Sequence, residues 1–262
     1  VAYPHAPALD AVAAAAARGE PHTDAMLDGV RHSLWAIREA ERIAEVTALF
    51  DALPALYIAD GHHRSAAAAR VAATRRATAP RGAESHEGFL VVAFPHHALR
   101  ILDYNRVVRD LAGMTSHAFL ARLREKFDVA ASDAPVRPAR HGEFGLYAGR
   151  RWHRLLLRAA FTQPADPVAR LDVSLLTEHV LAPILGIGDV RVDPRVDFVG
   201  GGRGLDELVR RVDSGAMAAA FSLYPTRMDD LMAIADAGAV MPPKSTWFDP
   251  KLADGLVSHV LD

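Results

Sequence analysis

The sequence predicts a mixed α/β protein of the α+β type, in which helices and strands alternate along the chain. Half of the 262 residues are hydrophobic and 24% are charged, a balance typical of a folded globular chain. Short apolar stretches also alternate with Ala-rich or amphipathic ones, so hydrophobic periods of two and of about 3.6 residues follow one another. Twice, a short apolar stretch runs through glycine into a helical pattern.

The first half of the chain supplies helices and short strands in turn. High Ala content or helical spacing of apolar side chains predicts helices over Ala8–Arg18, Glu39–Leu53 and Ser65–Arg76. Apolar runs predict strands over Val30–Ile37, Ala55–Ala59, Gly88–Pro95 and Leu99–Asp103. We expect the last two to pair around His96-His97, after a polar loop over Thr74–Glu87.

The second half continues the alternation. The same criteria predict helices over Ser116–Phe127, Asp172–Leu185, Leu205–Val212 and Met228–Ala237, the first capped by Ser116 and the second ended near Gly186. Predicted strands are Phe144–Ala148 and Arg151–Arg158, which form a hairpin at Gly149-Arg150, and Val196–Val199, Ala216–Tyr224 and Leu256–Val260. A stretch with two prolines, Ser132–Arg140, predicts a linker between domains at 1–131 and 141–262, or a bend within one continuous domain.

Charge and cysteine content exclude several classes of function. The formal net charge is −2, which argues against binding to nucleic acid or to an anionic membrane surface. The chain has no cysteine, so disulfides, thiolate nucleophiles and cysteine-held metals are excluded. No apolar run approaches the length of a membrane span. We therefore expect a cytoplasmic protein that binds neither nucleic acid nor a membrane.

The strongest local pattern is Asp60-Gly61-His62-His63-Arg64-Ser65, which leads from an apolar stretch into a helix. A glycine permits a left-handed turn, and the first-turn amides of a helix attract anions. An arginine adds a charge-assisted contact to phosphate. In the alternative interpretation, Asp60 caps the helix and pairs with Arg64. Adjacent histidines point in different directions, so a metal site at this turn is not expected.

Three further patterns carry polar or glycine residues beside apolar ones. Gly200, Gly201, Gly202 and Arg203 form either a phosphate-binding nest or a tight crossover turn. Lys244 begins a Lys-Ser-Thr sequence, but Pro243 stands where a phosphate loop needs its second glycine, so a phosphate loop is excluded. Lys244 is then either a lone phosphate contact or a solvated lysine. Asp103, Asn105 and Arg106 follow a strand, and an Asp103–Arg106 structural pair is the simpler interpretation.

Four motifs together resemble domain-of-unknown-function family 1015, from about Asp28 to the C-terminus. The motifs are Ala59–Arg64, Asp103–Arg106, Asp197–Gly201 and Met241–Phe248. The turn also resembles the Asp-Gly-His-x-Arg signature of the ParB/sulfiredoxin superfamily, which includes free-serine kinases. The resemblance implies a ParB/sulfiredoxin-like part followed by a second mixed part. It also implies that an N-terminal Lys-His-Glu-x-Thr-Arg portion of the family is missing here.

These likenesses lead to a functional prediction. We expect a phosphotransferase that uses ATP or ADP with Mg²⁺ and a small hydroxyl acceptor such as serine. Asp60, His62 or His63 would act on the acceptor, whereas Gly61, Arg64, Ser65 and Lys244 would bind phosphate. A nucleotide-binding regulator without catalysis and a phosphatase or nucleotide hydrolase are the alternatives.

Overall fold

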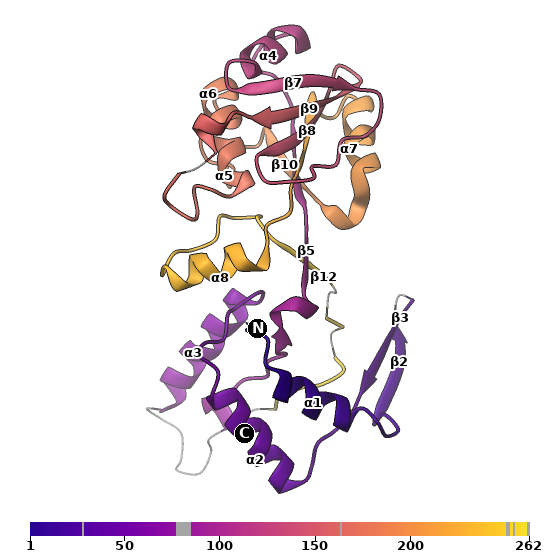
Figure 1. The fold of residues 1–262 in the computed structure, drawn as a ribbon, viewed down its shortest axis with the longest axis vertical. Helices are drawn as coiled ribbons and strands as arrows, with labels where there is room; N and C mark the ends of the chain where they lie inside the picture. The colour runs from indigo at the N-terminus through magenta and orange to yellow at the C-terminus, as the bar shows by residue number, and fades with distance from the viewer. Residues whose placement is uncertain (28, 77–84, 163, 250–251, 254, 261–262) are drawn as a thin grey trace. The chain divides into compact units, whose positions relative to one another are not determined.

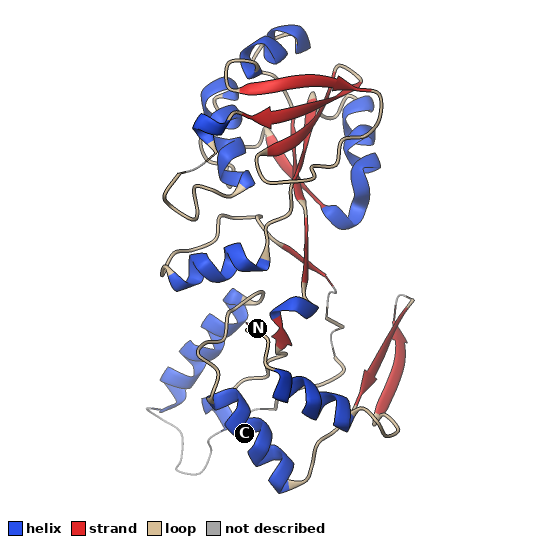
Figure 2. Cartoon of the chain, in the orientation of Figure 1, coloured by secondary structure: helices blue, strands red, loops and turns tan. Residues whose placement is uncertain are grey.

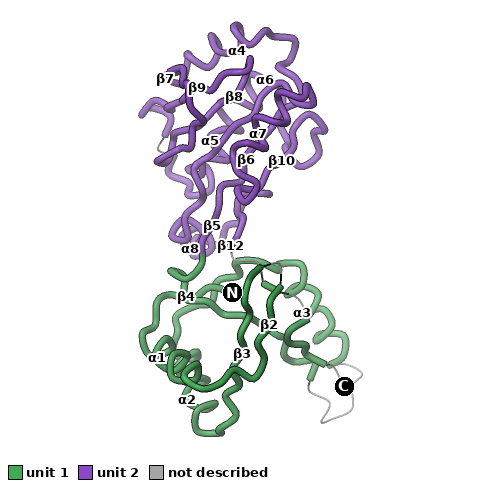
Figure 3. Tube along the Cα trace, turned by 90° about the vertical axis from the view of Figure 1, so that its right-hand side faces the viewer, with its two compact units in different colours: residues 1–99, 250–262 green, residues 100–249 purple. Residues whose placement is uncertain are grey.

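The computed structural model describes residues 1–27, 29–76, 85–162, 164–249, 252–253 and 255–260 (Figure 1). The chain divides into two compact units, which Figure 3 colours separately. Unit 1 comprises Val1–Leu99 with Pro250–Asp262, and unit 2 comprises Arg100–Asp249. Both units contain helices and strands, so the predicted α+β class is confirmed (Figure 2).

Unit 1 is built mainly from helices. The helices α1 (Pro7–Ala16), α2 (Ala40–Asp51) and α3 (His62–Arg76) match the three predicted ones. A hairpin joins β2 (Thr23–Leu27) to β3 (Val30–Leu34), and β1 (Ala2–Tyr3) pairs in parallel with β4 (Phe94–Pro95). Short 3₁₀ turns cover Ser85–Glu87 and His96–Ala98.

One strand predicted in unit 1, Ala55–Ala59, does not form. Within it, Tyr57 forms an isolated antiparallel bridge with Ala2 of the two-residue strand β1. The predicted pair Gly88–Pro95 and Leu99–Asp103 is also wrong. β4 pairs with β1, whereas β5 (Arg100–Leu102) pairs with β12 (Trp247–Asp249). The apolar run that precedes Phe94 is largely exposed, so its hydrophobicity does not report a buried strand.

Unit 2 is organised by a six-stranded antiparallel sheet in the order β10-β6-β11-β8-β9-β7. Its strands are β6 (Tyr104–Val108), β7 (Phe127–Ser132), β8 (Glu143–Ala148), β9 (Arg151–Leu157), β10 (Val196–Gly200) and β11 (Ala219–Leu223). The predicted hairpin at Gly149-Arg150 is confirmed as β8–β9. Both turn residues have positive φ, 58° and 62°, as a two-residue turn matched to strand twist requires.

Alternating side chains give this sheet two apolar faces. Val108, Leu146 and Phe221 pack with the helical segment Asp172–Leu185, whereas Val107 and Tyr147 pack with Leu208 of α7 (Gly204–Asp213). Figure 1 shows α7 and the α5–α6 segment on opposite sides of the sheet. The two-residue period of a strand thus supplies one core per face.

The helices of unit 2 follow the sequence closely. α5 (Asp172–Leu176), a π-helical turn (Thr177–Leu181) and α6 (Ala182–Leu185) form the predicted segment, which ends at Gly186 with φ 68°. α8 spans Met228–Asp236. α4 spans Ser116–Leu123, but its N-cap is Thr115 and not Ser116, since the Thr115 hydroxyl accepts from the Ala118 amide at 3.2 Å.

Two predictions about chain organisation differ from the structure. The Pro-containing stretch Ser132–Arg140 lies inside unit 2 and joins β7 to β8, where Val136 is buried. The unit boundary instead falls after Leu99, and the chain returns to unit 1 at Pro250. The predicted last strand, Leu256–Val260, does not form, and the last strand of the described residues is β12. Within the described ranges, no helix combines the length and apolar character that a membrane crossing requires.

Candidate functional site

The Asp60 turn of unit 1 is a left-handed entry into α3. Ala59 is buried, and the chain emerges at Asp60, whose Oδ1 accepts a hydrogen bond from the Gly61 amide at 2.8 Å. Gly61 has φ +83°, which other residues rarely adopt. Its carbonyl accepts from the Ser65 amide at 3.0 Å and from the Ser65 hydroxyl at 3.2 Å. Asp60 and Ser65 therefore hold the backbone of the turn.

The first turn of α3 leaves donors for a ligand. The amides of His62, His63 and Arg64 have no acceptor among the described residues, as expected for the first turn of a helix. The Arg64 guanidinium lies over Gly61, with Nε and Nη2 each 3.5 Å from the position a Gly61 Cβ would take. All three side chains are exposed. Free amides beside a guanidinium favour an anion, and above all a phosphate.

The remaining candidates belong to unit 2, where strand pairing brings three separate motifs together. β6 pairs with β10, so Tyr104 lies opposite Gly200 and Asn105 lies opposite Val199. β5 pairs with β12, so Trp247 lies opposite Leu102, just before Asp103. The motifs that begin at Asp103, Asp197 and Met241 thus meet at the start of β6. We call this group of residues the β6 cluster.

Asp103 and Asn105 form the buried polar part of the β6 cluster. Asn105 Nδ2 donates to Asp103 Oδ2 at 2.5 Å, and Asn105 Oδ1 accepts from the Leu223 amide at 3.0 Å. Asp103 Oδ1 lies 3.4 Å from Arg137 Nη1. The expected Asp103–Arg106 pair is therefore wrong. Asn105 and Arg137 both contact the Asp103 carboxylate, which favours a structural role for Asp103.

The glycines of the β6 cluster permit close approach of other groups. A Cβ on Gly200 would lie 2.3 Å from the Trp247 ring, and one on Gly201 would lie 2.5 Å from Asp103 Oδ1. The Gly201 amide donates to the Asp103 carbonyl at 2.7 Å. Gly202, by contrast, has only Trp247 Nε1 nearby, at 3.9 Å. This geometry favours the tight crossover turn over a phosphate nest.

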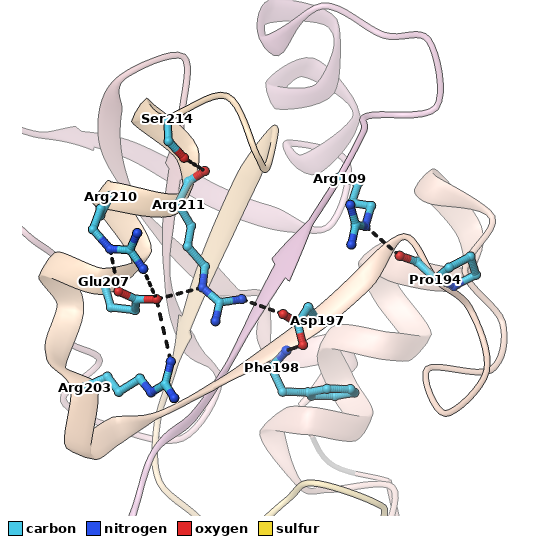
Figure 4. A network of polar contacts seen from close by, with 9 residues as sticks. All are labelled: Arg109, Pro194, Asp197, Phe198, Arg203, Glu207, Arg210, Arg211 and Ser214. Carbon is cyan, nitrogen blue, oxygen red and sulfur yellow. Dashed lines mark hydrogen bonds and ion pairs between the residues drawn. The ribbon is translucent and has the colours of Figure 1, made fainter.

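Arg203 and Asp197 take part in a network of ion pairs around α7 (Figure 4). Glu207 Oε1 lies 3.9 Å from Arg203 Nη1 and accepts from Arg211 Nε at 2.8 Å. Arg211 also donates to Asp197 Oδ2 at 2.5 Å. Hydrogen bonds from Arg211 and Arg210 hold the pKa of Glu207 below its usual range. Burial raises the pKa of Asp197, but the Phe198 amide and Arg211 lower it further, so its pKa is also below the usual range. The contacts favour a structural role for Arg203.

Lys244 contacts Arg106 through its backbone carbonyl. Lys244 has φ 54°, and its carbonyl accepts from Arg106 Nη2 at 2.9 Å. Its ammonium lies 6.0 Å from the centre of the Tyr104 ring. The Tyr104 ring in turn packs edge-on against Trp247 at 5.6 Å. Lys244 belongs to unit 2 and the Asp60 turn to unit 1, so its phosphate contact stays a prediction.

Sequence patterns missed another group of possible ligands in unit 1. One ligand atom from each of His5, Asp10 and His97 lies within 4.8 Å of the others, a spacing that a metal ion could bridge. His5 Nε2 lies 3.0 Å from Asp10 Oδ2, and the two imidazole rings are 4.6 Å apart. Because His97 is distant in sequence from the other two, no local spacing motif reveals the group.

Fold and site together define a two-unit α+β protein with a helix-entry turn in unit 1 and three convergent motifs in unit 2. Residues 1–174 match the family described as "Protein of unknown function (DUF1015)". The chain belongs to this family, which confirms the predicted resemblance. The matched stretch contains the Asp60 turn and the Asp103 motif, whereas the motifs at Asp197 and Met241 lie beyond it.

Solved structures give weaker likenesses. A conserved hypothetical protein from Pyrococcus furiosus is 12% identical with a TM-score of 0.39, over 94% of this chain and 85% of that chain. A free serine kinase in complex with AMP is 13% identical with a TM-score of 0.41, over 94% and 82%. A variant of free serine kinase in complex with ADP has 16% identity and a TM-score of 0.36, over 94% and 83%. No curated protein matches the sequence.

Proposed function

We propose that the Asp60 turn binds the phosphates of a nucleotide and that the protein is a small-molecule phosphotransferase. One observation carries the proposal. The exposed first-turn amides of His62, His63 and Arg64 lie beside the guanidinium that covers Gly61. A helix of fifteen residues presents its positive end here, so a phosphate gains both hydrogen bonds and favourable charge.

Each residue of the turn has a role in this proposal. Arg64 and the amides hold phosphate oxygens, and Gly61 lets the backbone approach them. His62 and His63 are exposed, so either imidazole can reach a hydroxyl acceptor as general base. Asp60, whose Oδ1 already accepts from the Gly61 amide, orients the turn or the acceptor. Mg²⁺ would arrive with ATP or ADP as part of the substrate.

The resemblance of Asp60–Arg64 to the Asp-Gly-His-x-Arg signature supports the same assignment. In the ParB/sulfiredoxin superfamily this turn and the helix that follows it hold nucleotide phosphates. Within unit 2, Lys244 is proposed as a lone phosphate contact. Serine or another small hydroxyl compound is proposed as acceptor.

Calorimetric titration with ATP, ADP and CTP, with and without Mg²⁺, tests the phosphate site. Arg64→Ala removes the guanidinium and should weaken nucleotide binding by about 10- to 100-fold, the range for hydrogen bonds to a charged group. Arg70→Ala is the matched control, because Arg70 is exposed on the same helix and no ion pair of its side chain occurs among the described residues. Equal affinity of the wild type and Arg64→Ala would refute the site.

Turnover separates the candidate functions. A phosphotransferase forms ADP from ATP only when a hydroxyl acceptor such as serine is present. Phosphate release without an acceptor would identify a nucleotide hydrolase. Saturable binding without turnover, lost in Arg64→Ala, would identify a nucleotide-binding regulator.

A further inference from the structure

Strand β6 of unit 2 carries a buried arginine that makes no ion pair with the described residues. Arg106 is 2% exposed. Its Nη1 donates to the Tyr104 carbonyl at 2.5 Å and its Nη2 to the Lys244 carbonyl at 2.9 Å. The guanidinium carbon lies 4.7 Å from the centre of the Phe198 ring. In the described part of the chain, no Asp or Glu comes within ion-pair distance of Arg106.

This environment is costly for a positive charge. Carbonyl dipoles and an aromatic face stabilise the guanidinium, but neither supplies a negative charge. Burial lowers the pKa of Arg106 to about 9, which still leaves it protonated at neutral pH. A guanidinium has five donors, and the two carbonyls use two of them. Donors remain for an anion.

Arg106 also lines a cavity. The cavity has a volume of about 300 Å³, at the small end of the range for ligand sites. Its apolar walls include Val173, Val190 and Pro242, and Ser174 adds a hydroxyl. Arg106 belongs to β6 and its Nη2 donates to the Lys244 carbonyl, so the pairings that assemble the β6 cluster also place Arg106 among the lining residues.

The charges around the cavity select the anion. Arg191 and Asp189 also line it, but they neutralise each other, since Arg191 Nη2 donates to Asp189 Oδ2 at 2.7 Å. Glu178 is a further carboxylate at the wall. Arg106 and Glu178 then leave the lining with no net positive charge, so it favours an anion of low charge over a dianionic phosphate. A monoanion with a planar, two-oxygen head fits the guanidinium fork best.

We propose that this cavity binds a small monocarboxylate with a short apolar body. The carboxylate accepts hydrogen bonds from Arg106, and the apolar body packs against the valine and proline walls. The site lies wholly within unit 2. The phosphate site proposed at the Asp60 turn belongs to unit 1.

Calorimetric titration of the whole protein with sodium butyrate tests the proposal, with sodium chloride and inorganic phosphate at matched ionic strength as reference anions. We expect saturable binding of butyrate, tighter than that of acetate because of the added apolar contact, and none of chloride. Arg106→Met keeps an apolar side chain against Phe198 and should weaken butyrate binding by about 10-fold or more. Arg122→Met is the control, because Arg122 is exposed and lies in α4, away from the lining residues.

The comparison of acetate with butyrate uses the wild-type protein, so it tests the proposal even if Arg106→Met does not fold. No saturable butyrate binding, or acetate and butyrate bound equally, overturns the proposal. Inorganic phosphate bound more tightly than butyrate also overturns it. So does unchanged butyrate affinity in a folded Arg106→Met. Nucleotide binding that is lost in Arg64→Ala but kept in Arg106→Met would show that the two sites are separate.

Discussion

Gly201→Ala gives the sharpest test of how the β6 cluster is held together. The new Cβ would lie 2.5 Å from Asp103 Oδ1 and 2.8 Å from the Asp103 carbonyl oxygen. The carbonyl belongs to the backbone and accepts from the Gly201 amide at 2.7 Å, so it cannot turn away without losing that bond. Asp103 is also buried and fixed by Asn105.

The magnitude follows from two contributions. Overpacking a closely packed interior costs about 1–3 kcal/mol. Loss of the Gly201–Asp103 hydrogen bond adds about 1 kcal/mol. We therefore expect the free energy of unfolding of unit 2 to fall by about 2–4 kcal/mol. For a unit of this size, each kcal/mol lowers the midpoint of thermal unfolding by roughly 2–4 °C.

Gly202→Ala is the matched control for this prediction. A Cβ on Gly202 would meet only Trp247 Nε1 at 3.9 Å, an ordinary contact. Gly202 lies in a 3₁₀ turn, where alanine is tolerated, so stability should stay within about 1 kcal/mol of the wild type. Urea unfolding followed by tryptophan fluorescence measures both variants. If Gly201→Ala is as stable as Gly202→Ala, the close approach of Gly201 to Asp103 is wrong.

Two further predictions concern an ion pair and a helix cap in unit 2. His141 Nδ1 lies 2.8 Å from Asp172 Oδ1, and the Asp172 carboxylate raises the pKa of His141. The ion pair therefore stabilises the fold fully below pH 6.5, and this contribution is lost as the pH rises through the raised pKa. Urea unfolding between pH 5.5 and 8.5 should therefore show a smaller loss of stability above pH 6.5 in His141→Gln than in the wild type. If the free energy of unfolding of both proteins depends on pH in the same way, the His141–Asp172 ion pair is wrong. Thr115→Ala removes the cap of α4 and should cost about 1 kcal/mol in the same assay, whereas Ser116→Ala should cost less; the reverse order would restore Ser116 as the cap.

Much of the local structure could be predicted from the sequence. The helix that ends at Gly186 and the hairpin at Gly149-Arg150 depend on residues close in sequence, since left-handed backbone favours a few residue types. The Asp60 turn is of the same kind. Its glycine and the helix that follows it can be recognised in the sequence, and the structure adds the position of the Arg64 guanidinium.

Strand partners that are distant in the sequence could not be predicted in this way. Leu99–Asp103 reads as half of a hairpin with the apolar run before it, yet β5 pairs with Trp247–Asp249, far along the chain. A strand shows its apolar face in the sequence, but hydrogen-bonding edges are alike in every strand. The predicted linker at Ser132–Arg140 failed for a related reason, because prolines mark a bend equally well inside a unit and between units.

The sequence by itself determined the α+β class, most helices, the family and the chemistry available at the Asp60 turn. Only the tertiary structure decided that the motifs at Asp103, Asp197 and Met241 form one cluster, that Asp103 pairs with Arg137, and that Arg106 is buried beside a cavity. The physical reason is that helix spacing and turn conformation are set by neighbouring residues. The surroundings of a buried charge are set by segments that meet only when the sheet has formed.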